Sequence, residues 1–196
     1  LLWGAAGKVV SDGVASWGAP PRMCLTAGDG VAVAYTGTNT VLLQKLDSAG
    51  SAIWASPVIV SEASHYMSAS DVKPADAGGV IVLWVRGTTT NPITSAKALY
   101  SQKFDSTGAP VWVGTGASTG GGSPVIVFNT TSIQNGYFPT FLSDGAGGGV
   151  YGWYEIGGSR NAYIQHVLAS GAFKFAAPVA NTGATPGFAR YGAGLG

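Results

Sequence analysis

The segment Gln44-Lys-Leu-Asp-Ser-Ala-Gly50, followed by Trp54, occurs three times along this chain. The later copies are Gln102-Lys-Phe-Asp-Ser-Thr-Gly108 with Trp112, and a weaker one, Gln165-His-Val-Leu-Ala-Ser-Gly171 with Phe173. The glutamines are 58 residues apart (102 − 44) and then 63 residues apart (165 − 102), and the turn glycines keep the same two spacings. Such a period predicts a repeat protein, in which each unit buries its apolar face against its neighbour.

A second repeated block precedes each of these copies. It consists of a glycine, an apolar run and an aromatic residue five places after the glycine, as in Gly30–Tyr35, Gly79–Trp84 and Gly148–Trp153. In the second copy both alternating faces are apolar, which predicts a strand packed between two other sheets. The glutamine segment predicts a half-exposed strand, with Lys45, Lys103 and His166 on its solvent face.

Turn chemistry connects these strands into a meander. Asp47 and Asp105 occupy the first position of a type I turn, and a glycine at the fourth position of the turn closes a hairpin. A strand ending in Trp54 or Trp112 is expected to follow, and a proline-led strand is expected to precede the glycine block. The proline-led strands are placed at 21–26, 72–75 and 139–143.

Four-stranded sheets repeated every ~40 to 60 residues are typical of propeller blades. The predicted fold class is therefore all-β, a β-propeller with three recognisable four-stranded blades and partial flanking units, and with almost no helix. The units span about 4–56, 57–114 and 115–178 within a single domain or segment, 1–196. Because closed propellers use roughly four to eight blades, we expect a longer polypeptide or a ring that another chain completes.

These motifs also carry a resemblance. The pattern Asp-Gly-x-Gly-Gly-(apolar)-Trp, then Tyr-x-Gln-x-(apolar)-Asp-x-x-Gly-x-x-x-Trp, resembles the β-propeller repeats of large, mostly uncharacterised, secreted or surface-bound bacterial proteins. The resemblance implies a propeller and an extracellular setting, and it offers no catalytic residues to carry over. Leu168 and Phe173 depart from the pattern. The segment 105–112, with its Asp, Thr-Gly and Trp, also resembles the tryptophan-docking repeat of quinoprotein dehydrogenases. This likeness concerns how the repeat is built and does not indicate a quinone cofactor.

Composition favours the cell exterior. Charged residues make up only 10% of the chain and glycines number 31, so Ser, Thr, Asn and Gly must cover much of the surface. We therefore expect an extracellular, cell-surface or periplasmic protein. A net charge of +1 gives no reason to invoke nucleic acid, and no apolar stretch has the ~20 residues of a membrane helix.

The recurring polar and aromatic residues are interpreted as structural. Recurrence of Gln44, Gln102 and Gln165 in every unit favours a hydrogen bond to backbone, and recurrence of the tryptophans favours the core. The tryptophans concerned are Trp54, Trp84, Trp112 and Trp153. Cys24 is interpreted as a small hydrophobe in an apolar strand.

Few residues point to chemistry. Asp29, Asp76 and Asp144 each offer one carboxylate, which favours turn capping over calcium, and an exposed strand position is the favoured interpretation of His166. We expect no catalytic constellation, no metal site and no cofactor.

Function is expected where the repeats differ. Inserted loops at 87–97 and 114–136 should emerge on the face that also carries the blade-to-blade connections. Passive spacers are the favoured interpretation, but if the loops bind, the expected contacts are Tyr66, Arg86, Tyr137, Tyr154 and Arg160.

The preferred hypothesis is a non-catalytic module for protein–protein interaction or for surface or filament assembly, whose partners are other chains or further blades of the same polypeptide. A carbohydrate-binding module would instead need coplanar exposed tryptophans or tyrosines, and Trp17 is the tryptophan that lies outside the recurring pattern. A propeller-type glycosidase or lyase would need acidic and basic residues clustered at one mouth of the channel.

Overall fold

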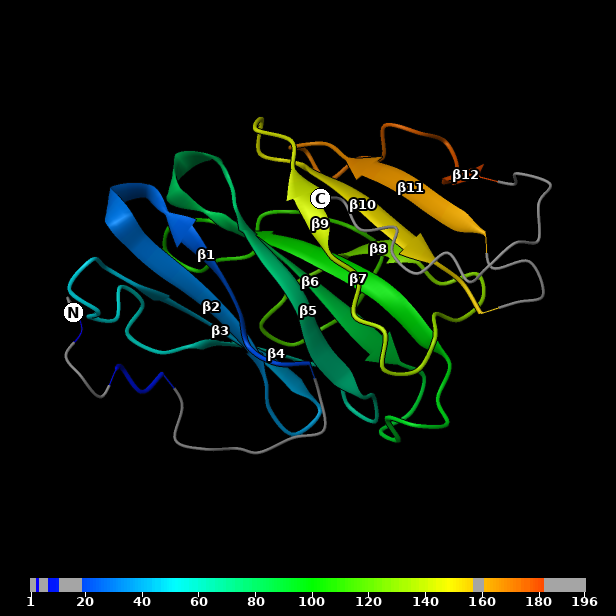
Figure 1. The fold of residues 1–196 in the computed structure, drawn as a ribbon, viewed down its shortest axis with the longest axis horizontal. Helices are drawn as coiled ribbons and strands as arrows, with labels where there is room; N and C mark the ends of the chain where they lie inside the picture. The colour runs from blue at the N-terminus through cyan, green and yellow to red at the C-terminus, as the bar shows by residue number, and fades with distance from the viewer. Residues whose placement is uncertain (1–2, 4–6, 11–18, 157–160, 182–196) are drawn as a thin grey trace.

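The strands form three separate antiparallel sheets of four strands each in a computed structural model that describes residues 3, 7–10, 19–156 and 161–181 (Figure 1). The first sheet contains β1 (Arg22–Thr26), β2 (Gly30–Thr36), β3 (Thr40–Leu46) and β4 (Val58–Ser61). The second contains β5 (Met67–Pro74), β6 (Val80–Gly87), β7 (Lys97–Phe104) and β8 (Val125–Phe128). The third contains β9 (Phe141–Ser143), β10 (Gly149–Tyr154), β11 (Ala162–Val167) and β12 (Val179–Asn181).

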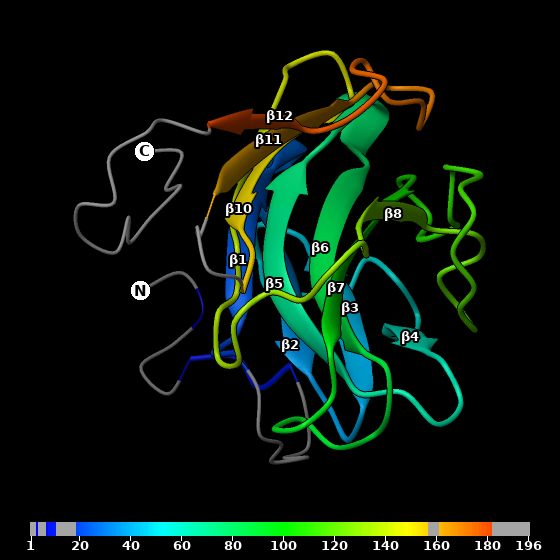
Figure 2. The ribbon, with the colours of Figure 1, turned by 90° about the vertical axis from the view of Figure 1, so that its right-hand side faces the viewer.

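Within each sheet the strands follow one another in chain order, so the predicted meander is confirmed. The all-β prediction is confirmed as well, because the helical segments of the described part are two short 3₁₀ turns, η1 (Ala27–Asp29) and η2 (Asp76–Gly78). The first strands β1, β5 and β9 lie near one another, and the fourth strands spread apart (Figures 1 and 2). The described residues do not close into a ring.

The middle sheet is packed on both faces. Along β6 every side chain from Val80 to Val85 is fully buried. Val80, Val82 and Trp84 join the cluster shared with the first sheet. Ile81, Leu83 and Val85 join the cluster shared with the third. The prediction of a strand packed between two other sheets is therefore confirmed for this unit.

The glutamine strands of the first two units differ from the prediction of a half-exposed strand, whereas β11 of the third unit is partly exposed, as predicted. All residues of β7 are buried, and Lys45 in β3 and Lys103 in β7 are buried too. The reason is that the predicted solvent face of β3 and of β7 is the face that packs on the following sheet. Their ammonium groups reach polar atoms at the edge of that interface instead of water.

The fourth strands also lie later than predicted. Trp54 and Trp112 belong to irregular segments, and β4 and β8 begin only after them, at Val58 and Val125. The tryptophan points away from its own sheet to reach the next unit, so its segment does not continue the ladder. The predicted loop 114–136 consequently contains β8 and is not one loop.

The first part of that segment fastens the second unit to the first. Thr119 exchanges backbone hydrogen bonds of 2.7 and 3.1 Å with Ser61 at the end of β4. Gly120 has a φ of +72°, and a Cβ on it would collide with the Ile59 carbonyl oxygen. The strap 113–124 therefore covers part of the outer edge of the first sheet, which blunts an otherwise open strand edge.

The repeated glycine before each second strand has a steric cause. A Cβ built on Gly79 would lie 2.5 Å from the Phe104 carbonyl oxygen, and one on Gly30 would lie 2.6 Å from the Leu46 carbonyl oxygen. Only glycine allows the chain to turn this close to the end of the glutamine strand.

Among the described residues, no helix is long and apolar enough to cross a membrane.

Candidate functional site

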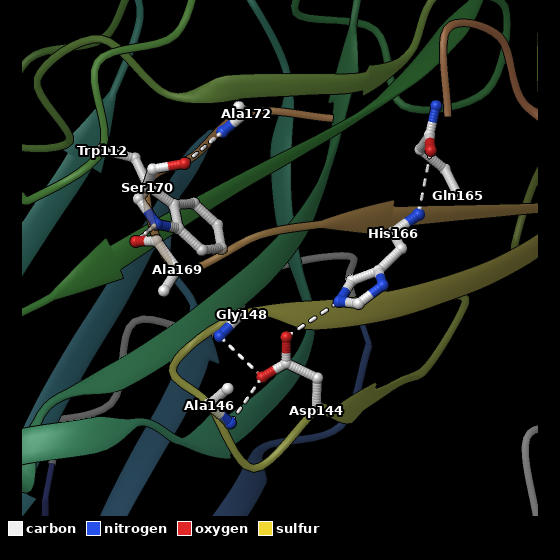
Figure 3. Close-up of polar contacts among 9 residues, drawn as sticks. All are labelled: Trp112, Asp144, Ala146, Gly148, Gln165, His166, Ala169, Ser170 and Ala172. Carbon is white, nitrogen blue, oxygen red and sulfur yellow. Dashed lines mark hydrogen bonds and ion pairs between the residues drawn. The ribbon is translucent and has the colours of Figure 1, made fainter. Parts of the chain in front are cut away.

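Two groups of contacts could serve a function, one at the hairpin turns and one on the opposite, loop-bearing face. At the turns, a tryptophan of each unit reaches the next unit. Trp54 Nε1 donates to the Ser106 carbonyl at 2.8 Å, and Trp112 Nε1 donates to the Ala169 carbonyl at 2.9 Å (Figure 3). Both indoles are almost completely buried. Successive units are therefore joined by the same directional contact.

The turn glycine makes room for the docked ring. Gly108 and Gly171 have φ values of +89° and +86°, and a Cβ on either would lie within 3.2 Å of the tryptophan docked above it. The same arrangement occurs at the first turn, where Trp3 Nε1 donates to the Ser48 carbonyl at 2.8 Å. Three turns in the described part thus each accept one indole.

The recurring glutamines hold the docking residues in place. Gln102 Nε2 donates to the Trp112 carbonyl at 3.1 Å and to the Gly121 carbonyl at 2.8 Å, and its Oε1 accepts from the Lys103 and Trp112 N–H groups. Gln44 donates to the Trp54 carbonyl at 3.2 Å in the same way. Each glutamine therefore fixes the backbone ten residues further on.

In the third unit this spacing corrects the sequence alignment. Gln165 Nε2 donates to the carbonyl of Phe175 at 3.0 Å, not to that of Phe173. The constant distance of four residues from turn glycine to docking aromatic, as from Gly108 to Trp112, would have given the same answer from Gly171 to Phe175. Phe175 is therefore the counterpart of the docking tryptophans, and it lacks their N–H donor.

The residue after each glutamine contributes a second contact near the turns. Lys45 Nζ donates to the Gly78 carbonyl in the next unit's 3₁₀ turn. Lys103 instead pairs with Asp76 of its own unit. In the third unit His166 Nε2 lies 2.8 Å from an Asp144 carboxylate oxygen (Figure 3). The sequence interpretation of His166 as an exposed strand position is wrong, because the Asp144 pair half-buries the ring.

Asp144 also caps its own turn. Its Oδ1 accepts hydrogen bonds of 2.8 Å from the N–H groups of Ala146 and Gly148 (Figure 3). These bonds and the neighbouring His166 hold the pKa of Asp144 below its usual value although burial acts in the opposite direction. Among the described residues, no group of three or more His, Cys, Asp or Glu side chains could hold a metal ion.

On the loop face, Arg86 is held by a carboxylate. Its Nε and Nη2 donate to the two oxygens of Glu62 at 2.8 and 2.6 Å, and its guanidinium lies 5.6 Å from the centre of the Tyr100 ring. His65 Nε2 lies 3.1 Å from Glu62, and burial together with Arg86 lowers the pKa of His65. Tyr66 is buried beside this group, its N–H donating to the Thr89 carbonyl at 2.7 Å.

The two tyrosines of the third unit come together. Tyr137 and Tyr154 stack with ring centres 4.1 Å apart, and the Tyr154 hydroxyl donates to Gln134. Burial, assisted by Tyr154, raises the pKa of Tyr137 to about 12. The predicted contacts thus separate into a Tyr66–Arg86 group and a Tyr137–Tyr154 group, and Arg160 lies outside the described residues.

Sequence reasoning did not single out Lys97. Its side chain is buried, and its Nζ donates to the Ser95 carbonyl at 2.9 Å. No carboxylate of the described residues pairs with it, and burial lowers its pKa. The hydroxyl of Ser95 is itself buried without a partner. A lysine at the start of a strand otherwise looks like any surface lysine, so no sequence pattern could have identified it.

The Glu62–Arg86 pair predicts a pH dependence of stability. Hydrogen bonding from Arg86 lowers the pKa of Glu62, so the pair's contribution is complete above the ordinary value of 4.5 and is lost as the pH falls through the lowered folded-state value. Glu62→Gln is expected to cost about 1–2 kcal/mol at neutral pH, because Arg86 loses its counterion. Urea unfolding of both proteins across acidic pH should show this difference shrinking, and a difference independent of pH would contradict the assignment.

The cysteine and the remaining acid have structural partners. Cys24 packs against the core between the first two sheets, and burial raises the pKa of its thiol to about 11. Such a thiol is a poor nucleophile at neutral pH. Glu155 accepts hydrogen bonds of 2.6 Å from both Thr131 and Tyr163. The geometry therefore favours docking between units over chemistry at a reactive side chain.

No model of a known protein family matches the chain, and no curated protein matches it significantly.

Proposed function

We propose that this chain forms part of a β-propeller that acts as a non-catalytic extracellular module for protein–protein interaction or for the assembly of a surface structure or filament. The observation that carries the proposal is the directional docking of Trp54 and Trp112 onto the following units. A contact that always points from one sheet to the next can be repeated along a series of units. The series forms a closed ring or an open filament, depending on the rotation between successive units.

The extracellular setting rests on composition and on the resemblance of the repeats. Charged residues are scarce, and the loops contain mostly glycine, serine, threonine and asparagine. A carbohydrate-binding role is less well supported, because Trp54, Trp84, Trp112 and Trp153 are all buried and offer no platform to a sugar ring. Tyr137 and Tyr154 stack on each other, which hides one face of each ring.

Sedimentation velocity across a wide concentration range tests the proposal. We expect species larger than the monomer, in a fraction that grows with protein concentration, and electron microscopy should show them as rings or as extended rods. A chain that stays monomeric at every concentration would overturn assembly. A monomer that is retained on immobilised polysaccharide would favour the carbohydrate-binding alternative.

A further inference from the structure

The third sheet has an outer face, turned away from the second sheet, which carries apolar side chains on neighbouring strands. Leu142 of β9, Ile164 of β11 and Val179 of β12 are all exposed there. Ile164 is paired in register with Val179, and Leu142 lies across Val150 on the same face. These three residues define what we call the third outer face.

The corresponding positions of the first sheet are covered. Leu43, like Ile164, directly precedes the repeated glutamine, and it is 0% exposed where Ile164 is 41% exposed. Cys24 and Val58, the counterparts of Leu142 and Val179, pack against the core shared with the second sheet. The third outer face therefore has the apolar pattern of a surface that another unit of this repeat covers.

The docking residues are also in place on this side. Phe175 is held by Gln165 at the position where Trp54 and Trp112 reach forward to the next unit. His166 occupies the position of Lys45 and Lys103, and its Nε2 pairs with Asp144 of its own unit in the way that Lys103 pairs with Asp76. Within the residues that the structure describes, the contacts that Trp54 and Trp112 make with a following unit have no counterpart for Phe175.

The first sheet presents the complementary half of such a junction. Met23 and Leu25 on β1 are 68% and 74% exposed at the β1 edge of the face that also carries Gln44. Elsewhere on this face Val33, Tyr35 and Leu46 are buried, and the Tyr35 hydroxyl donates to the Val10 carbonyl, so a partner would have to displace residues 7–10 as well as Trp3. In the second and third sheets the glutamine-bearing face is the one that receives the preceding unit. The turn of the first sheet, with Gly50, accepts a docked indole, and here that indole is Trp3.

We infer that the third outer face binds the glutamine-bearing face of the first sheet of a second copy of this chain, head to tail. The inference rests on the proposed function and names its partner. Phe175 of one copy would dock over Gly50 of the other in place of Trp3. Because the two contacting surfaces differ, each copy keeps one surface free for a further copy.

Complementation between two defective variants tests the arrangement. Ile164→Asp removes the third outer face and leaves the first sheet intact, whereas Leu25→Asp does the reverse. We expect each variant alone to be monomeric in sedimentation velocity and an equimolar mixture to form a one-to-one dimer. Restored pairing also shows that both variants are folded. Ile93→Asp, at an exposed residue of the loop after β6, is the matched control and should associate like the unaltered chain.

The competing role of Trp3 supplies a second test. Trp3→Ala vacates the first turn and is expected to increase association, and adding Phe175→Trp should strengthen it at least several-fold by restoring the N–H donor. Association that is unaffected by Ile164→Asp and Leu25→Asp would overturn the head-to-tail arrangement while leaving assembly intact. No association in any variant, Trp3→Ala included, would overturn both.

Discussion

Replacing Trp112 by alanine is expected to lower the free energy of unfolding by about 3–5 kcal/mol, the range for removing a large buried aromatic side chain. Trp112 is 2% exposed, packs in the cluster between the second and third sheets, and donates to the Ala169 carbonyl. Because the residue belongs to one sheet and its contacts to the next, the loss falls on the interface between them.

Hydrogen exchange distinguishes that interface effect from general destabilisation. In a chain of repeated units stability is the sum of unit terms and interface terms, so Trp112→Ala should expose the amides of β10 and β11 earlier than those of β2 and β3. Trp112→Phe keeps the ring and should cost only about 1 kcal/mol for the lost hydrogen bond. The exposed neighbour Val111 provides the control, and Val111→Ala should change stability by less than about 0.5 kcal/mol. Uniform loss of protection in all three sheets would contradict the docking role.

The strand order and the repeat could be predicted because they depend on local rules. The glycine before each second strand, the Asp-Ser-x-Gly turn and the alternation of apolar residues act over a few neighbouring residues, and all of them are visible in the chain. The position of the fourth strands was mispredicted, since a tryptophan favours a strand by propensity while its burial depends on the neighbouring unit. Tertiary docking therefore overrode local preference at Trp54 and Trp112.

The buried state of the lysines was not predictable for a related reason. Lys45 and Lys103 alternate with apolar residues as solvent-facing residues do, and only the next sheet covers their stems. Likewise, no pattern placed Glu62 opposite Arg86 or Asp144 opposite His166, because these partners are 24 and 22 residues apart and belong to different strands or connections. The candidate site thus depends on pairings between elements that sequence periodicity does not encode.

Replacing Gln102 by methionine is the other change for which we expect a large loss of stability, about 3–4 kcal/mol. Methionine fills a similar volume but lacks the amide group. Two backbone carbonyls and two backbone N–H groups therefore lose the hydrogen bonds that they make with Gln102. Each buried polar group left without a partner costs about 1–3 kcal/mol, and relaxation of the strap 113–124 should recover part of the sum.

The other two copies supply the matched comparison. Gln44 and Gln165 each donate to one carbonyl and accept from one N–H group, without the additional bonds of Gln102 to Gly121 and to the Trp112 N–H. Gln44→Met and Gln165→Met should therefore cost about half as much as Gln102→Met in urea unfolding. Equal losses of stability at all three sites would show that the additional bonds of Gln102 do not contribute to the free energy of unfolding. Losses below about 1 kcal/mol at every site would show that the glutamines do not hold the docking residues in place, since each substitution removes the partner of at least two backbone groups.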